Sequence, residues 1–422
     1  MTPNILFDAS RLLTRTTRDA PTGIDRVCLA YAEWLIDHPL FRMVPVKGRA
    51  GQLAMVDNQW FRQQMTALRA RWDGSSHKPL RREDLALLAA LAQETRPARS
   101  LHSPVPVEAA KPKLRKRAFK QFIRARRVET IPSALAYINV GHTGLNEPEP
   151  LATLKAAGIT TILMVHDLIP LTHPEYCRPG DDEKHRHRMT HALTMGDHII
   201  ANSQYTADEL HSFAAAHNLP SVPTQVAHLG IEKRLIDTTP SCSARPYFVH
   251  IGTIEARKNL AFLLTVWRRL EETMKEKTPS LVLVGQYGWE NENVLDLLER
   301  SPNLQGLVHQ ISGISDDGLA TLLSGARALV APSSVEGFDL PAVEASAMGL
   351  PIIASDIPAH RELTPHARLV DPIDGPGWVS ALQDWTLNPP TAPSYKAPTW
   401  EAHFKLIEQQ ILTPLAARIL EM

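Results

Sequence analysis

Short apolar runs alternate with amphipathic stretches along most of the chain. In the second half these runs predict buried strands at residues 247–251, 280–284, 307–311, 328–331 and 351–354. The first half repeats the alternation less regularly, and its predicted strands lie at residues 4–9, 135–140, 159–165 and 198–201. Strands that alternate with helical patterns are typical of parallel sheets covered by helices on both faces. We therefore expect an α/β fold of two doubly wound parallel-sheet domains, with a cleft between the carboxyl ends of their strands.

The chain has 422 residues, which exceeds what one hydrophobic core usually supports and also favours two domains. The stretch 237–246 is rich in Thr, Ser and Pro and poor in apolar residues, so we place the hinge there. The prediction assigns residues 1–238 to an N-terminal domain and residues 245–395 to a C-terminal domain. Residues 396–422 are expected to form a C-terminal helix that packs back toward the N-terminal domain.

A segment near residues 75–130 fits this alternation poorly and is predicted to be an insertion in the N-terminal domain. It holds a helical piece at 82–94 and then a basic run, in which residues 109–127 include nine Lys or Arg and no acidic residue. Apolar residues fall on one helical face of this run, so residues 111–127 could lie on an anionic membrane surface. A solvated face on an inserted helix explains the same pattern equally well.

The composition favours some classes of protein function and argues against others. Hydrophobic residues make up 44% and charged residues 21%, as in soluble globular enzymes, and the net charge of +0 gives no reason to expect a nucleic-acid partner. The cysteines, Cys28, Cys177 and Cys242, are far apart, which argues against a disulfide framework or a zinc site and favours a reducing cytoplasm. No apolar run approaches the roughly 18 residues of a membrane span, and no secretion signal is expected.

The stretch 333–344 combines a strand end, a glycine loop and a helix start. The predicted strand 328–331 runs into it, and Pro341 sits where a first helical residue is favoured. Unpaired backbone N–H groups and the positive end of the helix dipole then face the loop, which suits a phosphate. Glu336 lies in the loop. Glu344, about one turn inside the helix, leans back toward the same ligand, where a carboxylate suits ribose hydroxyls.

A second signal follows the predicted strand 247–251. Gly252 ends the strand, a short loop carries Arg257 and Lys258, and Asn259 is a suitable N-cap for an amphipathic helix. Two cations at a helix start repel its dipole, so they are unexpected as stabilisers. They make sense if they hold an anion, and a diphosphate is the natural candidate. Taken alone, the pattern is equally compatible with a solvated loop of ordinary surface charges.

Histidines supply further candidates. His166 follows the apolar run 159–165 and so lies at a strand's carboxyl end, where ligands bind in such sheets, although a buried, hydrogen-bonded histidine is the alternative. The strand-end loop 286–289 could contact a base or simply pack. A polar helix face, without the Glu of a zinc motif, is our interpretation of His185, His187 and His191.

These motifs resemble the GT4 family of glycosyltransferases. Residues 252–259 (GTIEARKN) and 336–344 (EGFDLPAVE) are similar to its donor-site motifs, and the Glu-x7-Glu spacing of Glu336 and Glu344 is its hallmark. In the first half, residues 22–26 resemble the family's first glycine loop, and residues 165–175 are similar to its mannosyltransferase-like members. The resemblance implies the GT-B fold, in which two Rossmann-like domains face an interdomain cleft.

The resemblance also implies roles for individual residues. Arg257 and Lys258 would hold the leaving diphosphate, and Glu344 would hold the nucleotide ribose. Glu336 would lie near the donor sugar, and His166 would face that sugar from the other domain. The remaining residues placed at the donor site are Gly23, Gly252, Thr253, Gly337, Phe338, Asp339 and Leu340.

No metal or other cofactor is expected. The family is similar to metal-independent retaining transferases, and no Asp-x-Asp lies in a suitable strand-end loop of this chain. Arg257, Lys258 and a helix N-terminus can neutralise the developing charge of the leaving group instead of Mg²⁺.

Three positions depart from the family pattern. Thr253 stands where many members have Arg, and Arg257 could compensate for the lost phosphate contact. Asp339 replaces a usual glycine, so its carboxylate could alter donor choice or weaken donor binding. Asp25 also replaces a common glycine. It could serve as an acid or base near the acceptor, but capping a helix that starts at Arg26 is the favoured explanation.

The sequence therefore predicts a retaining glycosyltransferase of polysaccharide or lipopolysaccharide biosynthesis. Its first-guess donor is GDP-mannose, and its acceptor is a glycan or a lipid-linked precursor. It is expected in the cytoplasm, either free or peripheral on the inner face of the membrane. Two alternatives stay open: a GT-B epimerase or hydrolase of nucleotide sugars, and a non-catalytic binding or scaffold protein.

Overall fold

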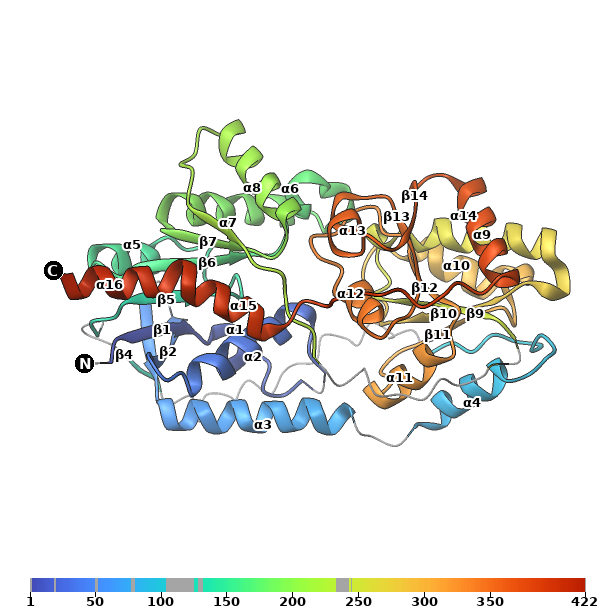
Figure 1. Ribbon diagram of the computed structural model, residues 1–422, viewed down its shortest axis with the longest axis horizontal. Helices are drawn as coiled ribbons and strands as arrows, with labels where there is room; N and C mark the ends of the chain where they lie inside the picture. Colours follow the sequence, from blue (N-terminus) through green and yellow to red (C-terminus); the bar gives the residue numbers. More distant parts are fainter. Residues whose placement is uncertain are drawn as a thin grey trace.

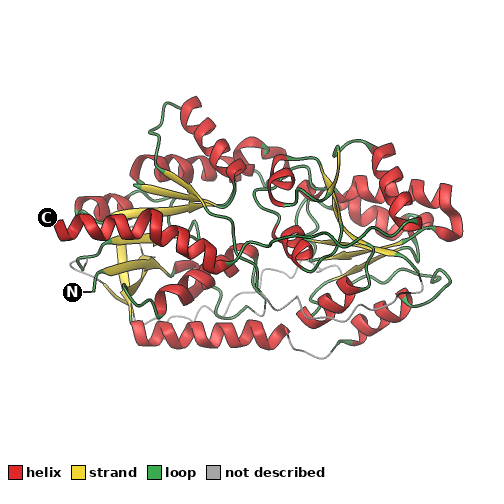
Figure 2. Cartoon of the chain, viewed as in Figure 1, coloured by secondary structure: helices red, strands yellow, loops and turns green. Residues whose placement is uncertain are grey.

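The computed structural model describes residues 2–18, 20–49, 52–76, 80–103, 125–127, 132–232, 243 and 245–421. Figure 1 and Figure 2 show two sheets that lie side by side along the long axis of the molecule, each with helices packed against it. The predicted α/β fold of two parallel-sheet domains is confirmed, with one edge of the first sheet built differently from the expectation.

The N-terminal sheet has the strand order β4-β3-β2-β1-β5-β6-β7-β8. Its strands are β1 (Asn4–Asp8), β2 (Arg42–Arg49), β3 (Gln52–Val56), β4 (Ala125–Arg127), β5 (Ala136–Asn139), β6 (Thr160–Val165), β7 (His198–Ala201) and β8 (Thr224–Val226). Neighbours are parallel except at the β4 edge, where β3 pairs antiparallel with both β2 and β4. This edge was not predicted, because Pro45, Lys47 and Arg49 interrupt the apolar run of β2.

Helices cover both faces of this sheet. They are α1 (Ser10–Leu13), α2 (Gly23–Ile36), α3 (Asn58–Ser76), α5 (Glu149–Ala156), α6 (Ile169–Thr172), α7 (Asp181–Met195) and α8 (Gln204–Ala216). On one face, Tyr31 of α2 and Phe61 of α3 are fully buried in the core that contains Phe7 of β1. On the other face, Leu154 of α5 and Ala192 of α7 pack in the core that contains Leu6. The alternating side chains of β1 thus serve two cores.

The C-terminal sheet has the order β11-β10-β9-β12-β13-β14, and all of its pairs are parallel. Its strands are β9 (Tyr247–Ile251), β10 (Ser280–Val284), β11 (Val308–Ile311), β12 (Ala328–Ala331), β13 (Ile352–Ser355) and β14 (Arg368–Val370). Its helices are α9 (Leu260–Met274), α10 (Glu292–Arg300), α11 (Asp316–Ser324), α12 (Leu340–Ala347), α13 (Pro358–Leu363) and α14 (Gly375–Leu387). Trp267 of α9 and Trp378 of α14 fill the core on one face, and residues of α11 and α12 fill the other.

One segment of the first half packs on the second sheet. The helix predicted near 82–94 exists as α4 (Arg82–Leu91), but its Leu87 and Leu91 enter the core that contains Val249 and Val282 of the C-terminal sheet. Further along, His102 forms a parallel bridge with Gln310, which extends the β11 edge. We call residues 80–103 the strap, because they leave the N-terminal half and cover this edge of the other sheet (Figure 1).

Most of the rest of the inserted segment lies outside the residues that the structure describes. The basic run 111–127, with its predicted membrane surface, lies outside the described residues apart from β4. Most of the predicted hinge 237–246 lies outside them as well. Among the helices that the structure describes, none combines the length and apolar character needed to cross a bilayer.

The end of the chain returns to the first half. α15 (Trp400–Ile407) continues through a π-helical turn (Glu408–Leu412) into α16 (Thr413–Glu421), and these helices lie across the N-terminal half in Figure 1. The Tyr31 hydroxyl of α2 lies 2.7 Å from Nε2 of His403, and the rings of Trp34 and Phe404 stack with their centroids 4.5 Å apart. This packing holds the C-terminal helices against α2.

Candidate active site

The loop between β12 and α12 brings Glu336 and Asp339 to the carboxyl end of the C-terminal sheet. Asp339 occupies the N-cap position of α12 with φ 54, a left-handed conformation, and its side chain does not cap the helix. Leu340 is the first residue of α12, so Pro341 takes the second position and not the predicted first one. The missing N–H of proline is tolerated at both positions, since neither has an intrahelical partner.

Arg257 and Lys258 lie in a single 3₁₀ turn (Ala256–Lys258) between β9 and α9. The predicted capping role of Asn259 is wrong. Asn259 stands at the N-cap of α9 with φ 55, and its side-chain amide donates to the carbonyl oxygen of Pro372 at 3.1 Å. A capping side chain normally needs an extended backbone, which the left-handed conformation does not provide.

These two loops meet in a continuous row of alternating charges, which we call the charge row. Arg257 donates through Nε to Glu255 and through Nη1 to Glu336, at 2.6 and 2.5 Å. Lys258 Nζ lies 2.5 Å from Oε1 of Glu336 and 3.4 Å from Oδ1 of Asp339. The row ends at His360 of α13, whose Nε2 lies 2.9 Å from Oδ2 of Asp339. Three carboxylates and two permanent cations therefore alternate at the carboxyl end of the C-terminal sheet.

The surroundings fix the protonation of the charge row. Burial alone would raise the pKa of Glu336, but Arg257 and Lys258 lower it below its ordinary value. Burial likewise opposes the charge on Asp339, yet the Lys258 ammonium and the His360 ring lower its pKa strongly. The pKa of Lys258 is raised, because Asp339 and Glu336 outweigh its burial. Both carboxylates and the ammonium are therefore charged at neutral pH.

Two unpaired polar atoms lie near the row. His250 of β9 donates through Nδ1 to the Val330 carbonyl oxygen at 2.9 Å, and burial lowers its pKa to about 4. Its Nε2 is buried and has no hydrogen-bond partner among the described residues, and the same holds for the Ser333 hydroxyl. A Cβ on Gly252 would lie 3.4 Å from this Nε2 and 3.0 Å from Cε of Lys258, so Gly252 lies directly against the row.

His166 reaches the same region from the N-terminal sheet. It follows β6, its side chain is buried, and its Nε2 lies 2.8 Å from the Val140 carbonyl oxygen. Burial lowers its pKa, so the ring is neutral and Nε2 carries the proton that this contact needs. The hydrogen bond fits the buried-histidine interpretation, while the position at the strand end fits the ligand-facing one.

Two more histidines surround His166. His142 and His166 have ring centroids 5.0 Å apart, and His142 and His185 have theirs 6.0 Å apart. Prediction had placed His185 on a polar helix face, but it is buried, and its Nε2 lies 3.0 Å from the Asp167 carbonyl. His187 is exposed, as a polar face requires, and His191 contacts the Leu145 carbonyl. Across the described ranges, no group of His, Cys, Asp or Glu side chains is arranged to hold a metal ion.

Gly337 is the point of closest approach between the two halves. A Cβ built on Gly337 would lie 2.3 Å from the His166 carbonyl oxygen, so a larger residue would force the halves apart. Ser203 Oγ donates to the Gly337 carbonyl at 2.7 Å. Phe338 and Leu340, which the resemblance placed at the donor site, pack against the core of the N-terminal half. The loop that carries Glu336 therefore also joins the two domains.

Asp25 completes the start of α2. Thr22 is the N-cap, and its hydroxyl and the Asp25 carboxylate form a reciprocal capping box, so the helix begins at Gly23 and not at the expected Arg26. Arg11 and Arg15 also contact the fully buried Asp25. These contacts fit the capping explanation, and they leave no observation that favours an acid or base role.

Arg26 and Glu344 join the two halves. Nη1 of Arg26 lies 2.8 Å from Oε1 of Glu344, which stands on α12 as predicted. Burial raises the pKa of Glu344, although Arg26 counteracts it. Gly23, one turn earlier on α2, has open space around it, since a Cβ there would meet no atom within 4 Å. Thr253 packs against the loop after β10, where a Cβ on Gly288 would lie 2.7 Å from its methyl group.

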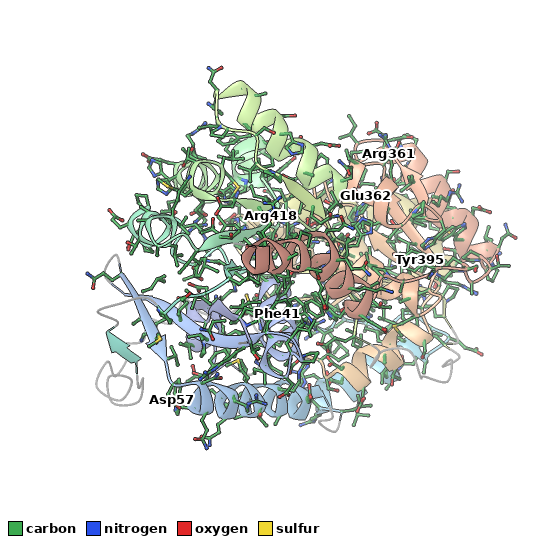
Figure 3. The ribbon with its side chains drawn as sticks, turned by 60° about the vertical axis from the view of Figure 1, so that its left-hand side comes forward. Phe41, Asp57, Arg361, Glu362, Tyr395 and Arg418 are labelled. Atoms are coloured by element: carbon green, nitrogen blue, oxygen red, sulfur yellow. The ribbon has the colours of Figure 1, made fainter. Side chains whose placement is uncertain are left out.

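Some residues of the site were missed from the sequence. Glu255 and His360 belong to the charge row, and Arg26 and Glu362 make contacts between the halves. Figure 3 shows Glu362 and Arg361 on α13, near the border between the two halves. Glu255 and Arg26 lay within recognised motifs but were given no role, whereas His360 and Glu362 become neighbours of the site through the tertiary fold.

Comparison with known proteins shows which families and structures this chain is similar to. Residues 234–395 match the family model of the glycosyl transferases group 1. The serotype-specific mannosyltransferase WbdA of Escherichia coli is 31% identical over 230 residues, which are 50% of this chain and 28% of WbdA. The O-antigen chain mannosyltransferase B of Escherichia coli is 29% identical over 221 residues, which are 50% of this chain and 56% of that protein. The chain thus spans less than two thirds of the length of these relatives.

A solved structure with the same architecture is HepE of Anabaena in complex with UDP and glucose. The match covers 99% of this chain and 98% of HepE, with 15% identity and a TM-score of 0.58. The fold is therefore that of the GT-B glycosyltransferases. The match to the family model of the glycosyl transferases group 1 is confined to residues 234–395, the part of the chain that carries the charge row.

Proposed function

We propose that this protein is a retaining glycosyltransferase that moves a hexose from a nucleotide-sugar donor to a hydroxyl group of a glycan or lipid-linked acceptor. The first candidate donor is GDP-mannose, because the relatives that match this chain are named mannosyltransferases. The acceptor oxygen forms the new bond to the anomeric carbon, and its proton passes to solvent water. The bond from that carbon to the diphosphate breaks, and the nucleoside diphosphate leaves with the electron pair.

The observation that carries the proposal is the position of Arg257 and Lys258. They lie at the carboxyl ends of β9 and β12, where ligands bind in such sheets, and beside the N-terminus of α12. Contacts among the described residues use Nε and Nη1 of Arg257, and the ammonium of Lys258 has three donors for two carboxylate partners. Donors therefore remain to bind a leaving diphosphate, which supports catalysis without a metal ion.

Replacement of Lys258 tests this proposal. Lys258→Ala is expected to weaken binding of GDP or UDP at least about tenfold and to abolish sugar transfer, because the cation that neutralises the leaving group is lost. Isothermal titration calorimetry with both nucleotides measures the first effect, and a screen of nucleotide sugars for transfer and hydrolysis measures the second. Chelation with EDTA should leave the wild-type rate unchanged.

A matched control is Lys277→Ala, which removes an exposed lysine from the same domain. It should bind nucleotide and transfer sugar like the wild type. Wild-type turnover in the Lys258→Ala protein would refute the role of Lys258. Binding of neither nucleotide by the wild type would point to a scaffold protein, and release of free sugar or an epimer without an acceptor would point to a hydrolase or epimerase.

A further inference from the structure

His360 lies between two hydrogen-bond acceptors. Its Nδ1 is 2.8 Å from the carbonyl oxygen of Ser355, and its Nε2 is 2.9 Å from Oδ2 of Asp339. Neither oxygen can donate, so both ring nitrogens must carry a proton for both bonds to form. The ring is fully buried. The geometry therefore describes a buried imidazolium at the end of the charge row.

Asp339 is held in a conformation that favours glycine. Its φ is 54, and the left-handed region is costly for residues with a Cβ, although Asp tolerates it better than most. Its side chain is only 3% exposed, and its two oxygens face His360 and Lys258. A strained, buried carboxylate persists only where its surroundings hold it, and here two cations do so.

We propose that His360 and Asp339 are a positioning pair for Lys258, an inference that rests on the proposed function. The imidazolium shares the charge of Asp339, so that this carboxylate orients the ammonium of Lys258 without holding it tightly. The 3.4 Å separation of Lys258 Nζ from Asp339, against 2.5 Å from Glu336, is consistent with this sharing. Lys258 then keeps a donor for the diphosphate of the nucleotide sugar.

Loss of the His360 proton would break this arrangement. A neutral imidazole has a single N–H and cannot satisfy both Ser355 and Asp339. The unshared carboxylate of Asp339 would then draw Lys258 away from the diphosphate. The other titratable groups that face the pair are Glu336, which acts through space, and His250, whose pKa of about 4 keeps it neutral at neutral and alkaline pH.

The sign of the pH dependence follows from the pKa of His360. Burial would lower that pKa, but Asp339, the Ser355 carbonyl and Glu336 outweigh burial and raise it above its ordinary value. Donor binding and turnover should therefore hold below this raised pKa and fall as pH rises through it. The pH–rate profile of the wild type should therefore have an alkaline limb, a fall in activity at high pH, and this limb should depend on His360.

The test compares His360→Gln with the double variant Asp339→Gly/His360→Gln. His360→Gln should lose the alkaline limb and lower kcat about tenfold at neutral pH, with the acceptor KM unchanged, because Asp339 is left unshared. The double variant should recover part of that loss, since it removes the carboxylate that misplaces Lys258. A merely structural role for His360 would make the double variant as poor as the single one or worse.

His366→Gln is the matched control, because His366 lies in the same domain and outside the charge row. It should keep the wild-type pH profile. If His360→Gln does not fold, Asp339→Asn tests the same pair: loss of the alkaline limb supports the inference, and an unchanged limb overturns it. Retention of the limb in His360→Gln, or no recovery in the double variant, also overturns it.

Failure of this inference is distinguishable from failure of the proposed function. If the wild type binds neither GDP nor UDP and transfers no sugar, the function itself fails. If the wild type binds nucleotide and Lys258→Ala does not, while His360→Gln behaves like the wild type at every pH, only the positioning pair fails.

Discussion

At the scale of single residues, Gly337 sets how closely the two domains approach. Its neighbour Glu336 must lie near Lys258 while the backbone of Gly337 presses against His166. Gly337→Ala would place a methyl carbon 2.3 Å from a backbone oxygen that cannot move aside easily. We expect kcat/KM to fall at least about tenfold, or ~1.4 kcal/mol of transition-state stabilisation, because a catalytic arrangement tolerates little displacement.

Steady-state kinetics with small-angle X-ray scattering checks this expectation, since the variant should also be more extended. Gly48→Ala is the control, because a Cβ there meets no atom within 4 Å and Gly48 does not have a left-handed φ. Normal kinetics and an unchanged radius of gyration in Gly337→Ala would show that the close approach affects neither catalysis nor the spacing of the domains.

Residues differ in how far the sequence reveals them. Glu336, Arg257 and Lys258 could be predicted because each stands in a short motif whose spacing implies a strand end or a helix start. His360 could not, because its partner Asp339 is distant in the sequence and the contact depends on how α13 packs beside α12. The carboxylate of Asp339, in the same motif as Glu336, contacts both His360 and Lys258, and no local pattern indicates this sharing.

At the scale of elements, apolar runs predicted the ends of the central strands to within one residue. They did not predict strands that charged residues and proline interrupt, such as β2, or short edge strands, such as β8 and β14. The helix α4 shows a second limit. Its apolar stripe indicates which face is buried, but no local pattern tells which of two sheets that face will cover.

The strap gives a prediction at this scale. Leu87→Ala removes a side chain that is 1% exposed in the core of the C-terminal sheet, so we expect the free energy of unfolding to fall by about 2–5 kcal/mol. Leu85→Ala is the matched control on the same helix, because Leu85 is 53% exposed, and it should change stability by less than about 0.5 kcal/mol. Denaturant titrations of the wild type and both variants measure these changes in the free energy of unfolding. Equal stabilities would mean that α4 adds nothing to the second domain.

At the scale of the whole molecule, polar contacts from several elements hold the two halves together around the site. Arg26 pairs with Glu344, and Ser203 donates to Gly337. The indole N–H of Trp289 donates to the Tyr176 carbonyl, and Arg178 lies 5.0 Å from the Trp289 ring centroid. The predicted loop 286–289 therefore packs against the other half in this arrangement.

Glu362 makes the most directional of these contacts. Its carboxylate accepts from the backbone N–H groups of Gln204 and Tyr205, at the start of α8, and lies 2.7 Å from Nε2 of His228. A carboxylate at a helix N-terminus offsets the helix dipole and satisfies unpaired N–H groups. Here the carboxylate belongs to the opposite half, so the stabilisation exists only while the halves are closed.

Closure should therefore depend on the charge of Glu362. Burial would raise its pKa, but the hydrogen bonds from His228 and the two backbone N–H groups lower it below the ordinary 4.5. For a lowered carboxyl pKa, the stabilisation is complete above the unperturbed value and is lost as pH falls through the lowered one. The closed arrangement should thus persist at neutral pH and weaken in the acid range below 4.5.

Glu362→Gln removes the charge at every pH while keeping the size of the side chain. We expect it to increase the radius of gyration at neutral pH and to raise the donor Kd, because the proposed donor site lies between the two halves. Small-angle scattering from pH 7 down to the acid range should show expansion in the wild type that the variant has already undergone.

The control is Asp356→Asn, which breaks an exposed ion pair with Arg361 inside one domain. If the wild type and Glu362→Gln have the same radius of gyration at neutral pH and expand in parallel on acidification, the halves are held together by the apolar contacts of Phe338 and Leu340 instead.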